Sequence, residues 1–230
     1  MTLSIITPVY NEKNTILEVL KKIEQANLND FSFKKEIIIV DDGSTDGTRD
    51  ILEKLEKKYK IIYHSENQGK GTAIRTALKQ VSGDYVIIQD ADLEYDPEDY
   101  RVMLGYALKN KAEVVYGSRQ LGTKNKHSYF SYYLGGVFLT FITNLLYRTN
   151  ITDESTGYKL FKTDTIKSIS LKCKRFEFCP EVTAKVAKKG IKIYEVPISY
   201  TPRHKEDGKK IRARDGIVAL WILVKCRFFD

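Results

Sequence analysis

The sequence predicts an α/β fold: a doubly wound, mostly parallel sheet, followed by a C-terminal region that is mainly helical. In the first half of the chain, short β-branched runs alternate with longer segments of helical periodicity. That order produces parallel strands joined by helices. The runs at 37–40 and 86–88 are apolar at every position, as expected for strands that helices cover on both faces.

The alternation can be followed element by element up to residue 119. Strands are predicted over Leu3–Thr7, Glu36–Val40, Lys60–Tyr63, Tyr85–Gln89 and Glu113–Tyr116. Helices are predicted over Thr15–Ala26, Thr48–Tyr59, Thr72–Val81 and Pro97–Asn110, where apolar residues recur at helical spacing. The second half loses this rhythm, and a final helix is expected from Asp215 to about Phe228. We expect one domain over 1–230, with its two halves at 1–119 and 120–230.

Composition indicates a folded, soluble chain with a preference for anionic partners. With 230 residues, of which 42% are hydrophobic, the chain can bury a sizeable core. Lys and Arg exceed Asp and Glu by 38 to 30, which suits phosphorylated ligands, anionic lipid or nucleic acid. The basic tail does not alternate aromatic and basic residues, so we do not expect nucleic-acid binding. The three cysteines fit no common zinc spacing and no signal peptide is visible, so we expect a cytoplasmic protein.

An uncharged, aromatic stretch from 128 to 147 is long enough to cross a bilayer. Small and polar residues such as Gly135, Gly136 and Asn144 interrupt it, which favours a core or an interfacial helix over a span. Four of its large apolar residues recur at helical spacing: Leu134, Phe138, Phe141 and Leu145. They would suit either contact with lipid or a buried core position.

Acidic residues directly follow two of the predicted strands. Asp41 and Asp42 end the second strand, and Asp90 and Asp92 follow the fourth. In an open parallel sheet, ligands bind beyond the carboxyl ends of the strands. Residues two apart on an extended chain face the same way, so Asp90 and Asp92 should point together, and Glu94 would continue that face if the chain stays extended.

Two carboxylates that point together repel each other unless a cation lies between them. Mg²⁺ or Mn²⁺ fits such a pair, because these ions keep some waters and take further ligands from substrate phosphates. The alternative is that the acids only cap a turn before Pro97. Similarly, Asp41–Ser44 could be a simple turn into a helix. The segment Gln68–Thr72 lacks phosphate-loop spacing, so a tight turn is the better interpretation, with a phosphate contact from Lys70 as the alternative.

Three segments carry a resemblance to a known family: Thr7–Glu12, Val40–Gly47 and Asp90–Asp92. In this order they resemble the signature of family 2 glycosyltransferases of GT-A fold. Further segments resemble the branch that makes polyprenyl- or dolichyl-phosphate sugars, and they lie at 117–119, 152–159, 175–181 and 208–211. The resemblance covers nearly the whole chain, and with it we expect a nucleotide-sugar-binding half at 1–119 and an acceptor- and membrane-side half at 120–230. It departs from the branch at Ser155, where many relatives carry an acid, and in lacking the C-terminal transmembrane helices of many members.

The resemblance implies roles for individual residues. Donor binding falls to Pro8, Tyr10, Glu12, Asp42, Asp90, Ala91 and Asp92. Asp90 and Asp92 would hold the metal, Mg²⁺ or Mn²⁺, with Glu94 as a third ligand, although some relatives have Gln there. Arg119, Arg203 and Lys210 match basic positions around donor or acceptor phosphate, with solvated surface as the alternative. Asp92 and Arg119 are the residues expected to carry catalysis.

The sequence therefore predicts an inverting glycosyltransferase that moves a hexose from a UDP- or GDP-linked sugar to polyprenyl or dolichyl phosphate. A phosphate acceptor, with a second pKa of about 6, needs cations more than a strong general base. A hydroxyl acceptor would need a carboxylate, for which Asp153 and Glu181 are candidates. We expect a peripheral protein on the cytoplasmic face of the membrane, acting with or without a separate membrane-protein partner. The alternatives are transfer to a soluble or growing cell-surface glycan, and a non-catalytic basic binding module.

Overall fold

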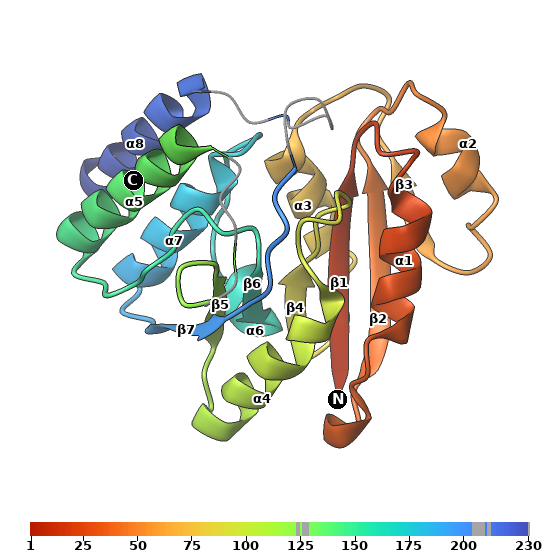
Figure 1. Ribbon diagram of the computed structural model, residues 1–230, viewed down its shortest axis with the longest axis horizontal. Helices are drawn as coiled ribbons and strands as arrows, with labels where there is room; N and C mark the ends of the chain where they lie inside the picture. Colours follow the sequence, from red (N-terminus) through yellow and green to blue (C-terminus); the bar gives the residue numbers. More distant parts are fainter. Residues whose placement is uncertain (123–124, 126–128, 204–209, 211–212, 230) are drawn as a thin grey trace.

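The computed structural model describes all residues except 123–124, 126–128, 204–209, 211–212 and 230. A seven-stranded sheet runs through it in the order β3-β2-β1-β4-β6-β5-β7 (Figure 1). The strands are β1 (Thr2–Val9), β2 (Lys34–Asp41), β3 (Lys60–Tyr63), β4 (Tyr85–Ile88), β5 (Val114–Ser118), β6 (Lys159–Lys162) and β7 (Ile193–Pro197). Neighbouring strands are parallel except at β6, which is antiparallel to both β4 and β5. The predicted α/β, mostly parallel sheet is confirmed.

Helices cover both faces of this sheet. One face packs against α1 (Ile16–Gln25), α2 (Thr48–Glu53) and α4 (Tyr100–Asn110), and the other against α3 (Lys70–Leu78), α6 (Thr163–Lys167) and α7 (Phe178–Lys188). Short 3₁₀ turns, η1 (Asn29–Phe31) and η2 (Pro97–Asp99), precede β2 and α4. Two more helices, α5 (Phe130–Tyr147) and α8 (Ala213–Phe228), pack side by side and against α7 (Figure 1).

The elements predicted for the first half are present, with one helix shorter than expected. The helix predicted over Thr48–Tyr59 ends at Glu53, where N–H groups begin to bond three residues back, as from Leu55 to Leu52. This tightening converts the rest of the segment into turns. In the second half the sequence did not predict β6 or β7, because each is short and each completes its pairing with a distant strand.

The antiparallel strand β6 brings the second half of the chain to the acidic edge of the sheet. Its first residues pair near the carboxyl end of β4, so the segment 153–158 lies beside the chain that follows β4. The approach is close: a Cβ atom at Gly157 would lie 2.6 Å from Asp90 Oδ2. Residues from both halves of the sequence therefore share one sheet edge.

Gln89 stabilises this edge of the sheet through buried hydrogen bonds. It is fully buried between β4 and Asp90, and its Oε1 accepts hydrogen bonds from the hydroxyls of Tyr100 (2.6 Å) and Tyr158 (2.5 Å). Tyr158 also stacks on Tyr95, with ring centroids 4.7 Å apart. One amide oxygen thus joins the residue before Asp90 to α4 and to the start of β6.

Replacing Gln89 tests its role as the shared acceptor of the two tyrosine hydroxyls. Gln89→Leu leaves two buried hydroxyls without their acceptor, and we expect the free energy of unfolding to fall by about 3 kcal/mol. Tyr100→Phe removes one donor and leaves no orphaned group, so it should cost about 1 kcal/mol. Urea unfolding of the two variants measures the difference, and equal losses would contradict the shared-acceptor role.

Candidate active site

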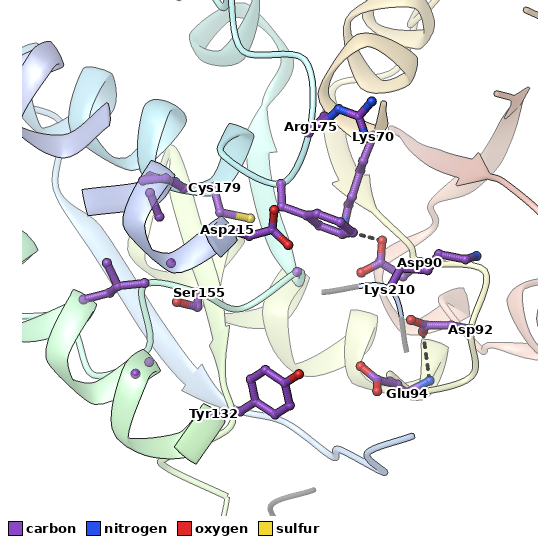
Figure 2. Close-up of a pocket in the computed structure, with 18 of the residues that line it drawn as sticks. Lys70, Asp90, Asp92, Glu94, Tyr132, Ser155, Arg175, Cys179, Lys210 and Asp215 are labelled. Carbon is purple, nitrogen blue, oxygen red and sulfur yellow. Dashed lines mark hydrogen bonds and ion pairs between the residues drawn. The ribbon is translucent and has the colours of Figure 1, made fainter. Parts of the chain in front are cut away.

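A cavity of about 940 Å³ opens at the carboxyl ends of the parallel strands. Its lining contains every residue that the sequence predicted for the site: Pro8, Tyr10, Glu12, Asp42, Asp90, Ala91, Asp92, Glu94, Arg119, Arg203 and Lys210. The last two come from the segment after β7, where the predicted motif residues Gly208, Lys209 and Ile211 lie outside the described residues. Figure 2 shows the acidic turn after β4 facing Tyr132, Ser155, Cys179 and Asp215 across the cavity.

The chain after β4 does not stay extended, so the geometric reason given for pairing Asp90 with Asp92 was wrong. It turns at Ala91, and Leu93 adopts a left-handed conformation with φ of 62°. Non-glycine residues in this region are uncommon and store strain. Asp92 Oδ1 accepts a hydrogen bond from the Glu94 N–H at 3.1 Å, which closes the turn. Both Asp90 and Asp92 still line the cavity, but through a turn.

Cationic side chains from distant segments neutralise the acids of the cavity. Lys70 Nζ lies 2.5 Å from Asp90 Oδ1. Arg203 bridges Asp92 and Glu12, with both N···O distances at 3.1 Å. Lys210 Nζ lies 2.6 Å from Glu12 Oε1. Lys70, which the sequence favoured as part of a simple turn, therefore belongs to the cavity.

Asp92 is an enclosed carboxyl whose pKa is raised. Burial raises the pKa of Asp92 to about 7, and the neighbouring Asp90 and Glu94 add to the rise while Arg203 opposes it. A cation that approaches such a carboxyl stabilises its ionised form. Within the described part of the chain, no three His, Cys, Asp or Glu side chains form a complete metal cage. The two acids fit a hard divalent ion that takes its other ligands from water or phosphate oxygens.

Glu94 forms hydrogen bonds with the segment that follows β7. Its Oε1 accepts from the Arg203 N–H at 2.8 Å and its Oε2 from the Tyr200 hydroxyl at 3.0 Å, while its carbonyl accepts from the Thr201 N–H at 2.9 Å. These bonds place the Arg203 guanidinium over the acidic turn. A metal-ligand role for Glu94 stays a prediction.

Asp41 and Asp42 have different tasks although they are adjacent. Asp41 is fully buried in β2, where its Oδ2 accepts from Arg49 Nε and Nη2 at 2.8 and 2.7 Å. It stabilises the turn and does not line the cavity, whereas Asp42 does. Asp46 accepts from the Thr48 N–H at 3.0 Å at the first residue of α2, where Gly47 holds the N-cap position.

Arg119 and Asp153 form a buried ion pair at the end of β5. The Arg119 Nε and Nη2 atoms each lie 2.7 Å from an oxygen of Asp153, and the Arg119 N–H donates to the same carboxylate at 3.0 Å. Burial opposes ionisation of Asp153, but Arg119 outweighs it and keeps the pKa of Asp153 below its ordinary value. The Arg119 guanidinium also lies over the Tyr200 ring, 5.1 Å from its centroid.

Neither candidate general base lines the described part of the cavity. Asp153 is bonded to Arg119, and Glu181 accepts from the N–H groups of Lys172 and Cys173 and from the Lys185 ammonium. The sequence did not single out Glu154, a buried lining residue whose Oε1 has no hydrogen-bond partner and whose pKa is raised by burial. The only feature of the sequence that could have identified Glu154 is its position next to Ser155, where the chain departs from its relatives.

The far wall of the cavity consists of α5 and α8, which also carry an exposed apolar face. Large side chains on it have more than half of their surface exposed, among them Phe130 (73%), Phe141 (61%), Leu145 (66%), Ile217 (73%) and Trp221 (57%). By length and composition α5 could cross a membrane, and only 17% of it is buried. The interpretation of α5 as a core helix is therefore wrong.

Comparison with known proteins places the chain in a family by its sequence. The sequence model described as Glycosyl transferase family 2 matches residues 4–170. This chain belongs to glycosyl transferase family 2. It is 32% identical over 215 residues to a UDP-N-acetylglucosamine–dolichyl-phosphate N-acetylglucosaminyltransferase of Methanococcus voltae, covering 84% of this chain and 83% of that relative. It is 28% identical to a dolichol-phosphate mannosyltransferase of Pyrococcus furiosus, covering 91% of this chain and 59% of that protein.

Two solved structures superpose on nearly the whole of this chain. Glucosyl-3-phosphoglycerate synthase from Mycobacterium tuberculosis, solved with Mn²⁺, uridine diphosphate and phosphoglyceric acid, superposes with a TM-score of 0.71 at 18% identity, covering 98% of this chain and 76% of that one. TarS from S. aureus, solved with UDP, gives 0.64 at 19%, covering 100% and 67%. At these identities the likeness shows the fold, which is GT-A.

A double-mutant cycle tests the buried ion pair. Breaking it from one side leaves an uncompensated buried charge, so Asp153→Asn and Arg119→Gln should each lower the free energy of unfolding by about 3–5 kcal/mol. The double variant should lose clearly less than the sum, because it leaves neither charge alone. Urea unfolding of the four proteins gives the coupling energy, and additive losses would show that the two side chains act independently.

Proposed function

We propose that this glycosyltransferase moves a hexose from a nucleotide-diphosphate sugar to polyprenyl or dolichyl phosphate. One observation carries the proposal: a single cavity joins an acidic, cation-binding edge to a wall made of two helices with an exposed apolar face. The curated relatives named for dolichyl-phosphate sugar transfer support it. An aqueous glycan acceptor would give no reason for the apolar wall.

The acidic edge is the proposed donor site. Asp90 and Asp92 would hold Mg²⁺ or Mn²⁺, which supplies charge neutralisation to the leaving diphosphate. Lys70, Arg203 and Lys210 form ion pairs with Asp90, Asp92 and Glu12, respectively. When the acids bind a metal ion, these basic side chains would be released to contact the donor phosphates. Pro8, Tyr10, Asp42 and Ala91 complete the donor side of the lining.

The acceptor side needs cations and no strong base. A phosphate acceptor is mostly dianionic at neutral pH, so one of its oxygens can attack the anomeric carbon directly. The bond from that carbon to the diphosphate oxygen breaks, and the nucleoside diphosphate leaves with inversion at the carbon. Arg119 and Arg175 line the cavity and would bring the two anionic groups together. This route agrees with Asp153 and Glu181 being bonded elsewhere.

We also propose that the α5–α8 face places the enzyme peripherally on the cytoplasmic surface of a membrane. The exposed aromatic side chains would enter the lipid, and basic residues near the end of α8, Lys225 and Arg227, would favour anionic headgroups. The acceptor would then reach the cavity along the wall that already faces the bilayer. A membrane-protein partner on the same face is the alternative occupant.

Labelled donor sugar tests the reaction. Asp92→Asn should lower metal-dependent transfer at least about 100-fold, because the donor site loses one of its two metal-binding charges. Asp96→Asn is the matched control: Asp96 caps η2 outside the cavity lining, and Asn caps as well as Asp. Label should appear in solvent-extractable lipid. Full turnover by Asp92→Asn would contradict the donor site, and product confined to the aqueous phase would contradict the lipid acceptor.

Vesicle flotation tests the membrane surface. Trp221→Glu with Phe141→Glu should lower partition onto anionic vesicles at least about 10-fold, since burying one large apolar side chain is worth about 1.5–3 kcal/mol. Leu17→Glu is the control, because Leu17 is 53% exposed on α1, away from this face. Equal loss in the control, or none in the double variant, would contradict the assignment.

A further inference from the structure

The loop that leads into β6 is held by side chains, because its backbone N–H groups have no neighbouring strand to bond. Glu195, on β7, accepts through both oxygens: Oε2 from the Thr152 N–H at 2.6 Å and Oε1 from the Asp153 N–H at 3.0 Å. The N–H groups immediately before and after this pair donate to Asn144 and Thr140 of α5, each at 3.0 Å. Four consecutive N–H groups therefore have side-chain acceptors, and Glu195 serves two of them.

Glu195 is itself fixed relative to the end of β5. The strands β5 and β7 pair in parallel, with Tyr116 opposite Glu195, and the pairing continues to Ser118. The Ser118 hydroxyl lies 2.6 Å from the Thr152 hydroxyl, so the loop also contacts β5 directly. Arg119 is the next residue after β5. The strand that carries Glu195 thus runs beside the strand that ends at Arg119, and the loop is bonded to both.

A carboxylate at this position carries an electrostatic cost. Burial raises the pKa of Glu195, and the nearby Asp153 adds to the rise, while the two N–H groups oppose it. An amide side chain of the same length would avoid the repulsion, but it has only one acceptor oxygen and would turn an NH₂ group toward the other N–H. Only a carboxylate can hold both N–H groups at once. The cost is therefore tied to the placement of Asp153.

Asp153 passes this placement on to Arg119. Its carboxylate is 2% exposed and binds the Arg119 side chain through two N–H groups, each at 2.7 Å. Arg119 lines the cavity, whereas Glu195 does not line the described part of it. We propose that Glu195 is a positioning residue, which fixes Asp153 and through it orients the Arg119 guanidinium toward the acceptor phosphate. This inference rests on the proposed function, and Glu195 acts on the acceptor only through the other two residues.

Steady-state kinetics of the full chain tests the role, with dolichyl phosphate as acceptor and the UDP- or GDP-linked hexose that the unsubstituted protein turns over as donor. Glu195→Gln should raise the KM for dolichyl phosphate about 10-fold, the equivalent of one weakened hydrogen bond to a charged group. The KM for the donor should stay within about 2-fold. Glu195→Asp keeps the charge but is one methylene shorter, so it should change the same constant in the same direction.

Glu36→Gln is the matched control. Glu36 is also a carboxylate that holds a loop, because it accepts from the Ser82 N–H at 2.9 Å and from the Ser82 hydroxyl at 2.7 Å. It does not belong to the cavity lining that the structure describes. Thermal unfolding should show a loss of stability in this variant, with both KM values unchanged. A purely structural Glu195 would behave in the same way.

A kinetic double-mutant cycle shows whether Glu195 acts through Arg119. Arg119→Lys keeps a charge beside Asp153 but loses the planar fork that gives the guanidinium its orientation. Adding Glu195→Gln to Arg119→Lys should therefore change the acceptor KM by less than about 2-fold. A further 10-fold rise would overturn the positioning role.

The remaining outcomes separate this inference from the proposed function. If the unsubstituted protein labels lipid and folded Glu195→Gln keeps its acceptor KM, the positioning role is overturned and the proposed function stands. An equal rise in both KM values would also overturn the role, because a general loss of structure acts on donor and acceptor alike. If the unsubstituted protein labels no lipid, the proposed function and this inference both fall.

Discussion

Negative charge gathered at the carboxyl ends of β1 and β4 is the constraint on which the rest of the cavity depends. Burial, together with the neighbouring Asp90 and Glu94, raises the pKa of Asp92 to about 7, so nearby positive charge is needed to favour its ionised form. The chain meets this requirement with Lys70, Arg203 and Lys210. Since these cations come from widely separated segments, the same ion pairs that balance the charge also draw those segments around the cavity.

Under the proposed function, the acids of this site would exchange their basic side chains for a metal ion. A charge pair in a partly enclosed site is costly to break unless a new partner arrives. A donor diphosphate with its metal would bring both signs of charge, so acids and basic side chains would each gain a partner as they part. The Glu94 bonds to the chain at 200–203 keep Arg203 close to the turn throughout.

Other parts of the cavity are fixed rather than exchangeable. Asp42 is held by three hydrogen bonds, and Arg119 by two contacts from the buried Asp153. Rigid groups suit recognition of a base and of a phosphate, whose shapes do not change during transfer. The α5–α8 wall is different again, since its apolar residues face outward and contribute little to the core. Its composition makes sense for a surface that meets lipid.

The sequence by itself determined the strands of the first half, the acids at their ends and part of the cavity lining. It could do so because strand and helix periods are local, and because the carboxyl ends of parallel strands must share an edge. Only the tertiary structure decided which cation lies on which acid, that the chain turns after Asp90, and that Asp153 serves Arg119. The bond from Arg203 to Glu12 joins residues 191 positions apart, and no local pattern encodes such a contact. The sequence identified the pair Asp90 and Asp92, but only the structure showed that Lys70 and Arg203 form ion pairs with them.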